Sequence, residues 1–400
     1  MTHDVAVIGA GPAGVAAAVA LARAGREVVL VDKATFPRDK ICGDGLTAQA
    51  LRHLEWMGLR PDAVASWQEV HDVVLRSPSG HEVQLPLPRH QGTFAAVARR
   101  YDLDAAVVDL ARKHDVDVRE GTTVESVEQD AGGVTLRTSG GPVRAAYVVA
   151  ADGMWSPTRK ALGLDVPGYR GEWHAFRQYF TDVTGPAARE LMVSFEADII
   201  PGYFWAFPLP GGGANVGFGI DRGGRNTTHD MKQLWPDLLA RTHLRDWLGP
   251  DARPEGPHRA WPIPARIDSL PSGRGRVLFV GDAVGACDPM TGEGIGQALL
   301  TGRLAADVVS REWPEPEVVQ RAYRHVLDRE LTPDHRMSVL LMRALGHRKG
   351  VRTAIRIAGA NDWTRRHFAR WLFEDYPRAL VVTPGRWRRG ALSSPGAFAS

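Results

Sequence analysis

The sequence predicts an α/β fold with an inserted antiparallel sheet and a helical C-terminal region. An apolar run, a glycine-rich loop and a helical pattern follow one another near the N-terminus and again after residue 276. Aromatic-rich, alternating runs occupy much of 171–275, and residues 313–400 carry helical patterns broken by prolines. With 400 residues, 44% hydrophobic and 24% charged, the chain is long enough for several packed units and is not expected to be disordered.

Cysteine number and the length of apolar runs narrow the class of protein. Cys42 and Cys287 are the two cysteines, which excludes a disulfide framework and a cysteine-based zinc site, and no metal site is predicted. No run approaches the roughly 18 apolar residues of a membrane-spanning helix. Because the chain passes from residue 4 directly into a strand-like run, we expect no secretory signal and a cytoplasmic protein.

Charge is distributed unevenly along the chain. The formal net charge is +3, but residues 341–400 carry 12 Lys and Arg against three acids, so the remainder is acidic. Tryptophans and phenylalanines lie between these arginines. Such a region is consistent with peripheral contact with an anionic membrane, or with a helical cap whose aromatic face packs inward while its arginines face water. No pattern typical of nucleic-acid binding occurs elsewhere.

The N-terminal glycine-rich loop has the spacing of a dinucleotide-binding unit. The apolar run 5–8 is followed by Gly9, Gly11 and Gly14, a helical pattern at 15–24, and a second apolar run that ends at Asp32. Gly9 permits the turn, Gly11 allows backbone to approach a pyrophosphate, and Gly14 allows close packing of helix and strand. Asp32 can accept hydrogen bonds from a ribose. The framing strands and the placed acid predict a Rossmann-type unit.

This loop alone does not distinguish NAD from FAD, and three later segments bear on the choice. Arg99 and Arg100 stand at the entrance of a helical run, and either fits that position. A strand at 148–151 leads into a turn that begins with Asp152 and Gly153. A strand at 276–280 leads to Asp282 and then to the glycine-rich loop 292–296, although a plain strand-end turn would also explain Asp282.

Together these segments resemble the FAD-binding fold of flavoproteins related to p-hydroxybenzoate hydroxylase. The stretches 36–47, 203–208 and 289–295 are similar to the geranylgeranyl reductase family within that superfamily, and the resemblance covers about residues 4–310. It implies FAD as cofactor, with NAD(P)H or a separate reductase as electron donor. The cofactor-binding residues that we expect are Gly9, Gly11, Ala13, Gly14, Asp32, Lys33, Arg100, Asp152, Asp282, Gly292, Gly294 and Ile295.

The resemblance also implies how the chain is divided. We expect a discontinuous FAD-binding domain from 1–69, 92–170 and 276–312. A substrate-binding sheet domain would comprise 70–91 and 171–275, and a C-terminal helical cap 313–400. Runs that alternate at 173–182, 190–197, 203–209 and 214–220 form the antiparallel sheet.

One strand of this sheet is expected to bind substrate. Tyr203, Trp205 and Phe207 alternate and therefore share a face, which suits a small apolar substrate such as one with a prenyl chain. Plain core packing explains the same pattern equally well.

The loop after the second strand carries the candidate catalytic residues Cys42 and Asp44. In the family this loop lies close to the flavin, and saturating an alkene needs a hydride on one carbon and a proton on its neighbour. Cys42, Asp44 or a water that they position would relay the proton. A buried, inert cysteine is an equal alternative for Cys42, and Cys287 is expected to be structural.

Three other activities share this architecture. An FAD-dependent hydroxylase of an aromatic or polyketide-like product is the main alternative to an isoprenoid reductase. A flavin-dependent halogenase fits less well, because no lysine occurs between Lys40 and Lys113 and the tryptophan-rich motif is altered at Tyr203 and Phe207. A non-enzymatic escort of prenylated proteins would not need the intact glycine-rich loop.

Overall fold

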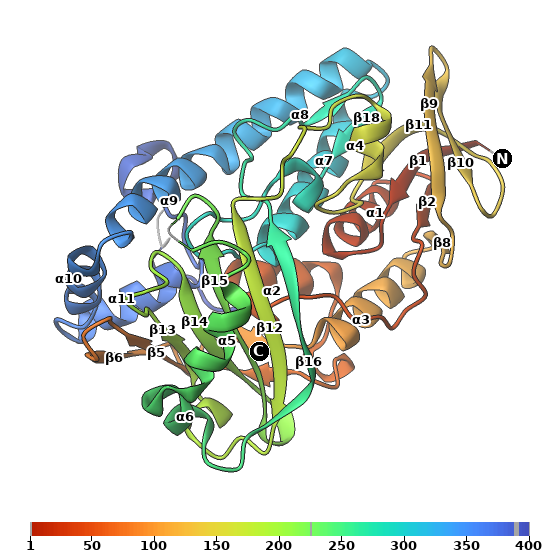
Figure 1. Ribbon diagram of the computed structural model, residues 1–400. Coiled ribbons are helices and arrows are strands. Elements are labelled where there is room, and N and C mark those ends of the chain that lie inside the picture. The colour runs from red at the N-terminus through yellow and green to blue at the C-terminus, as the bar shows by residue number, and fades with distance from the viewer. Residues whose placement is uncertain (1, 225, 388–391, 400) are drawn as a thin grey trace.

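The computed structural model describes the whole chain except residues 1, 225, 388–391 and 400. It contains two large sheets, a small third sheet and a helical C-terminal region (Figure 1). Among the described residues, no helix combines the length and apolar character needed to cross a lipid bilayer.

The first sheet carries the N-terminal unit. Its order is β17 (Gly273–Arg274), β18 (Val277–Phe279), β11 (Val143–Ala150), β1 (Thr2–Ile8), β2 (Val28–Val31) and β8 (Asp117–Arg119), with the hairpin β9 (Val124–Asp130) and β10 (Gly133–Thr138) extending from β11. The strands from β18 to β8 pair in parallel. Their carboxyl ends therefore meet at one edge, where ligands of such sheets bind.

Helices cover this sheet closely. They are α1 (Pro12–Arg23), α3 (Arg100–Lys113), α4 (Pro157–Ala161), α7 (Ile295–Glu312) and α8 (Pro316–Glu330). Residue Gly302 explains the tight approach of α7 to α1, because a Cβ there would lie 2.1 Å from the carbonyl oxygen of Ala13. The alanine-rich α1 is buried along almost its whole length.

The second sheet has the order β16 (Arg253–Ile263), β12 (Trp173–Thr181), β15 (Gly213–Asp221), β14 (Tyr203–Leu209), β13 (Leu191–Ser194), β5 (Asp72–Arg76) and β6 (Glu82–Pro86). The expected antiparallel pairing holds except between β13 and β5, which pair in parallel. Helices α5 (Met231–Ala240) and α6 (Thr242–Leu248) pack on one face, where Trp235 stacks on Phe218.

The small sheet joins the two large ones. Strand β7 (Ala95–Val97) lies between β3 (Gly45–Thr47) and β4 (Gln68–Glu69), and α2 (Ala48–Met57) follows β3 directly. Thr47 caps α2 by accepting a hydrogen bond from the amide of Ala50. The loop that carries Cys42 and Asp44 therefore leads directly into β3 and the capped helix α2.

The C-terminal region contains α9 (Thr332–Leu345), α10 (Arg348–Ala358) and α11 (Asp362–Leu372), followed by short 3-10 turns at 380–382 and 384–386. Helices α10 and α11 lie beside β5 and β6, at the opposite end of the molecule from the β9–β10 hairpin (Figure 1). A separate apolar core forms there between Val351, Ile355 and Phe373 and the β5–β6 pair.

Phe368, Trp371 and Phe373 face inward, as the cap hypothesis expects, whereas Trp363 and Trp387 are exposed. The expectation that the arginines of this region face water is wrong at two positions. Arg370 and Arg378 are buried. Arg370 contacts the Asp375 carboxylate and the carbonyls of Leu392 and Ser394, and Arg378 donates to the carbonyl of Trp371 at 2.6 Å. Both guanidinium groups donate to backbone carbonyls in the interior of the protein.

Candidate functional site

The glycine-rich loop lies at the carboxyl edge of the parallel sheet. Gly9 has φ +98°, and a Cβ at Gly14 would lie 1.8 Å from the carbonyl oxygen of Gly9, so neither position admits a side chain. Gly11 differs from both. A Cβ at Gly11 would meet no heavy atom of the described residues within 4 Å, because its backbone faces a cavity.

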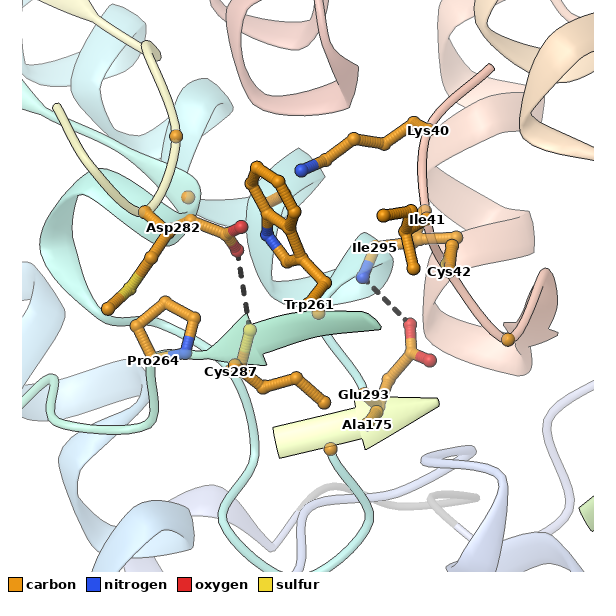
Figure 2. A pocket seen from close by; sticks show the side chains of 18 of the residues that line it. Lys40, Ile41, Cys42, Ala175, Trp261, Pro264, Asp282, Cys287, Glu293 and Ile295 are labelled. Carbon is orange, nitrogen blue, oxygen red and sulfur yellow. Dashed lines mark hydrogen bonds between the residues drawn. The ribbon is translucent and has the colours of Figure 1, made fainter. Parts of the chain in front are cut away.

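Three acids follow three strands of the parallel sheet and line the same cavity. Asp32 follows β2, and its carboxylate accepts hydrogen bonds from the amides of Ala10 and Ala34, both at 2.7 Å. Asp152 follows β11 and accepts from the amide of Thr158 at 2.8 Å. Asp282 follows β18 and accepts from the thiol of Cys287 at 3.4 Å (Figure 2).

These features fit the nucleotide that the sequence predicts. The second oxygen of Asp152, Oδ1, is buried and has no hydrogen-bond partner among the described residues. A buried unpaired carboxylate oxygen needs a donor, and the hydroxyl groups of FAD are suitable donors. The open backbone at Gly11 and the residue Asp152 both belong to the lining of this cavity.

The two arginines at the start of α3 have different surroundings. Arg99 forms a two-pronged ion pair with Glu255, at 2.9 and 2.6 Å. Arg100 is buried, lines the cavity and pairs with Asp104 at 2.6 and 2.7 Å. Arg38 binds the same carboxylate at 2.9 Å. Of the two candidates, Arg100 is the one beside the cavity.

The second glycine-rich loop precedes α7. Gly292, Gly294 and Ile295 line the cavity, and Figure 2 shows Ile295 and Glu293 beside Cys42 and Ile41. Glu293 accepts hydrogen bonds from the amides of Ile295 and Gly296, both at 3.0 Å. Burial, and then repulsion by Glu374, raise the pKa of Glu293 to about 8.

The loop 42–45 forms the centre of the cavity. Cys42 is partly buried, and the backbone amide of Asp44 points at its sulfur, at 3.3 Å. Burial raises the pKa of the Cys42 thiol, so this thiol stays protonated at neutral pH. The Arg100 guanidinium acts in the opposite direction and favours the thiolate.

Asp44 has a left-handed backbone, with φ 64°, and is fully buried. Its carboxylate accepts hydrogen bonds from the Tyr179 hydroxyl at 2.7 Å and from Asn215 Nδ2 at 2.8 Å. Burial raises the pKa of Asp44 to about 6, although these two bonds and the nearby Arg177 lower it. The pKa of Asp44 therefore lies closer to neutrality than that of an exposed aspartate.

Tyr203, Trp205 and Phe207 line one wall of the cavity. The Trp205 ring lies between the other two and is tilted against both, with centroids 6.0 and 6.2 Å away. Its indole NH donates to Asn215 Oδ1 at 3.0 Å, and Asn215 in turn donates to the Cys42 carbonyl at 2.9 Å. Asn215 of β15 thus links the aromatic strand to the Cys42 loop by hydrogen bonds.

The cavity continues away from the parallel sheet. Its volume is about 980 Å³, at the upper end of the usual range for ligand sites. Beyond Trp205 its lining is almost wholly apolar and comes from β5, β13 and the helices α9–α11; the residues include Leu75, Leu191, Phe195, Leu345, Ile355, Phe368 and Trp371. We call this part the apolar arm.

Every predicted site residue except Gly14 contributes to the cavity lining, and Gly14 lies in the first turn of α1. Sequence reasoning missed Lys40, whose ammonium lies 3.6 Å from the centre of the Trp261 ring (Figure 2). Burial lowers the pKa of Lys40. It also missed the buried Glu374, which lies outside the cavity lining, accepts a hydrogen bond from Gln297 at 2.7 Å and repels Glu293. Cys287 is buried, as expected of a structural residue, but it also lines the cavity.

Comparison with known proteins gives a consistent result. A family model described as an FAD binding domain matches residues 2–300. The menaquinone reductase of Mycolicibacterium smegmatis is 33% identical over 326 residues, which cover 77% of this chain and 76% of that protein. Digeranylgeranylglycerophospholipid reductase 2 of Methanopyrus kandleri is 32% identical over 340 residues, 82% of each chain.

Solved structures share the fold at lower identity. A geranylgeranyl bacteriochlorophyll reductase-like protein from Thermoplasma acidophilum has a TM-score of 0.80 and 22% identity, covering 96% of this chain and 99% of that one. The halogenase PltM has a TM-score of 0.71 and 20% identity, covering 99% and 88%. The architecture is therefore common to enzymes of different chemistry.

Proposed function

Because the chain belongs to the geranylgeranyl reductase family of FAD-dependent oxidoreductases, we propose that it reduces carbon–carbon double bonds of an isoprenoid chain. The observation that carries this proposal is the continuity of one cavity from the glycine-rich loop, past Cys42 and Trp205, into the apolar arm. The two curated relatives have names that refer to molecules with prenyl chains. FAD, when bound, would supply the hydride for such a reduction.

The nucleotide-binding roles follow from position and charge. The open backbone at Gly11 and the N-terminus of α1 suit the pyrophosphate, since helix N-termini favour anions. Asp32 and Asp152 suit ribose and ribityl hydroxyl groups, because both carboxylates line the cavity. Arg100 and Lys40 add positive charge near Asp282.

The apolar arm suits a prenyl chain because its lining offers few polar partners. Each buried methylene contributes about 0.8 kcal/mol to binding, so a five-carbon unit contributes at most roughly 4 kcal/mol. Trp205 and Phe207 border the passage between the arm and the Cys42 loop. A chain lying along them would present its double bonds at that loop.

Cys42 is the proposed proton donor to the substrate carbon. Burial keeps its thiol protonated until a base develops beside it. The amide of Asp44 and the guanidinium of Arg100 then stabilise the thiolate that remains. Asp44 is the proposed group that returns a proton to Cys42, because it follows Cys42 by two residues in the same loop and burial raises the pKa of its carboxyl to about 6.

The electron donor is proposed to be NAD(P)H or a separate reductase protein. The sequence holds no second dinucleotide loop besides the one at Gly9–Gly14, so a nicotinamide nucleotide would bind only transiently.

Anaerobic mixing of the reduced holoenzyme with polyprenyl substrates tests the proposed reaction. We expect the flavin absorbance to return without oxygen and the product to gain two hydrogen atoms. If reoxidation requires oxygen and the product gains an oxygen atom, the protein is a hydroxylase and the reductase proposal is wrong.

A further inference from the structure

Large apolar side chains are exposed at the end of the molecule formed by α9–α11. Leu340 on α9 is 58% exposed, Ile357 on α10 is 62% exposed, and Trp363 at the start of α11 is 62% exposed. Single exposed apolar residues are ordinary. Here three occur on consecutive helices at one end of the fold (Figure 1).

The apolar arm reaches the same end. Ala344 on α9 lines the cavity and is also exposed, so the cavity meets the surface there. On α10, Gly350 and Ala354 line the cavity, and Ile357 follows them at i+7 and i+3. Helical spacing places these three on one side of α10. Ile357 therefore lies beside the rim of the apolar arm.

A neighbouring side of α10 is basic. Lys349, Arg352 and Arg356 recur at i, i+3 and i+7 and are exposed, whereas Val351 and Ile355 face the core. Within the part of the chain that the structure describes, none of these three cations has a carboxylate within 4.0 Å. By contrast, the exposed Arg60, Arg89 and Arg137 each pair with a carboxylate.

We propose that the α9–α11 end of the molecule lies on an anionic lipid bilayer, with the apolar arm open to the membrane. Leu340, Ile357 and Trp363 would enter the interface while the basic side of α10 contacts acidic headgroups. A prenyl chain would then enter the cavity without crossing water. The entry route rests on the proposed function, whereas the membrane contact does not.

Charge and apolar area together favour a bilayer over other polyanions. A nucleic acid would be bound by the cations but would gain nothing from exposed isoleucine and leucine, and their burial in lipid removes apolar surface from water. An apolar cavity that opens at Ala344 can take up an apolar substrate directly only if the medium outside the opening is also apolar.

Cosedimentation with vesicles tests the contact directly, with the FAD-loaded protein and no substrate. We expect binding to phosphatidylcholine vesicles that contain phosphatidylglycerol and little binding to phosphatidylcholine alone. Each basic residue near an anionic surface strengthens binding roughly five-fold. The triple variant Lys349→Gln, Arg352→Gln, Arg356→Gln should therefore bind on the order of 100-fold more weakly.

The matched control neutralises three exposed arginines on other parts of the surface, Arg60→Gln, Arg137→Gln and Arg321→Gln, and should bind nearly as the parent does. Leu340→Ser with Ile357→Ser should weaken binding without altering its dependence on phosphatidylglycerol. Equal loss in the control, no binding by the parent, or displacement of vesicles by RNA would each overturn the proposal. All variants should retain the parent's Tm and FAD content.

Measurements of turnover distinguish the proposed membrane contact and entry route from the proposed reaction. With a polyprenyl substrate embedded in vesicles, the triple variant should lose activity in proportion to its lost binding, and the same substrate in detergent micelles should restore it. Parent protein that binds vesicles but reduces no prenyl substrate in either medium would contradict the proposed function alone. A triple variant that binds weakly yet reduces the embedded substrate at the parent's rate would contradict the entry route.

Discussion

Replacing Gly11 by alanine would separate the nucleotide-binding role of the glycine-rich loop from its role in folding. Gly11 has φ −73° and ψ 179°, which any residue adopts, and no heavy atom of the described chain lies within 4 Å of a Cβ there. Alanine is a poorer N-cap than glycine by about 0.5–1 kcal/mol. The lower entropy of its unfolded chain offsets a similar amount. We therefore expect the Tm of the apoprotein to change by no more than about 3 °C.

Binding of FAD should change far more, because the new methyl group projects into the cavity where the pyrophosphate approaches the backbone. Losing one hydrogen bond to a charged group costs about 1.5–3 kcal/mol, which weakens FAD binding roughly 10- to 150-fold. Titration of apoprotein with FAD, followed by fluorescence quenching, measures this change.

Two comparison variants distinguish a local effect on FAD binding from a general effect of replacing a glycine by alanine. Gly385→Ala is equally open and lies away from the cavity, so its FAD affinity should match that of the parent. Gly14→Ala places a Cβ 1.8 Å from a backbone oxygen and should prevent folding. If Gly11→Ala binds FAD as tightly as the parent, the assignment of this loop to the pyrophosphate is wrong.

Other residues of the site give further predictions. Cys42→Ala should slow turnover about 10²- to 10⁴-fold while FAD content, read from absorbance, is retained; equal loss of both would make Cys42 merely structural. The pKa of Asp44 is raised to about 6, so its carboxyl carries the proton that it returns to Cys42 only below about pH 6. In the parent, turnover should therefore fall as pH rises through about 6, and Asp44→Asn should abolish this inflection in the pH–rate profile. Burial raises the pKa of Glu374 to about 7, so the native state holds a proton that the unfolded chain releases, and stability is lost as pH rises from about 4.5 to 7. Glu374→Gln should therefore raise the Tm at pH 8.5 but not at pH 5, whereas Glu317→Gln, at an exposed position, should change the Tm at neither pH. An equal effect of Glu374→Gln at both pH values would show that ionisation of Glu374 does not destabilise the fold.

The nucleotide-binding unit could be predicted from the sequence because its determinants are local. The run around Gly9, Gly11 and Gly14 specifies a strand, a turn and a helix within two dozen residues, and the structure has them as β1 and α1. The aromatic alternation at 203–209 likewise corresponds to β14, with the same bounds.

Contacts between distant segments could not be predicted in this way. Glu374 reaches Gln297 and Thr47 only because the C-terminal region packs over both, and no local pattern encodes that proximity. Arg370 reads as a surface cation in a basic helix, yet Asp375 and two backbone carbonyls hold it in the interior. Lys40 could not be assigned to the site from its own segment, because its partner Trp261 comes from β16 in the second sheet.

The most direct test of the central claim is the isotopic composition of the product from one turnover. Reduced holoenzyme is given a polyprenyl substrate in deuterium oxide under labelled dioxygen, and the product is analysed by mass spectrometry. Hydride transfer followed by protonation predicts a product with two added deuterium atoms and no labelled oxygen. A product that carries labelled oxygen and keeps its double bond would contradict the account.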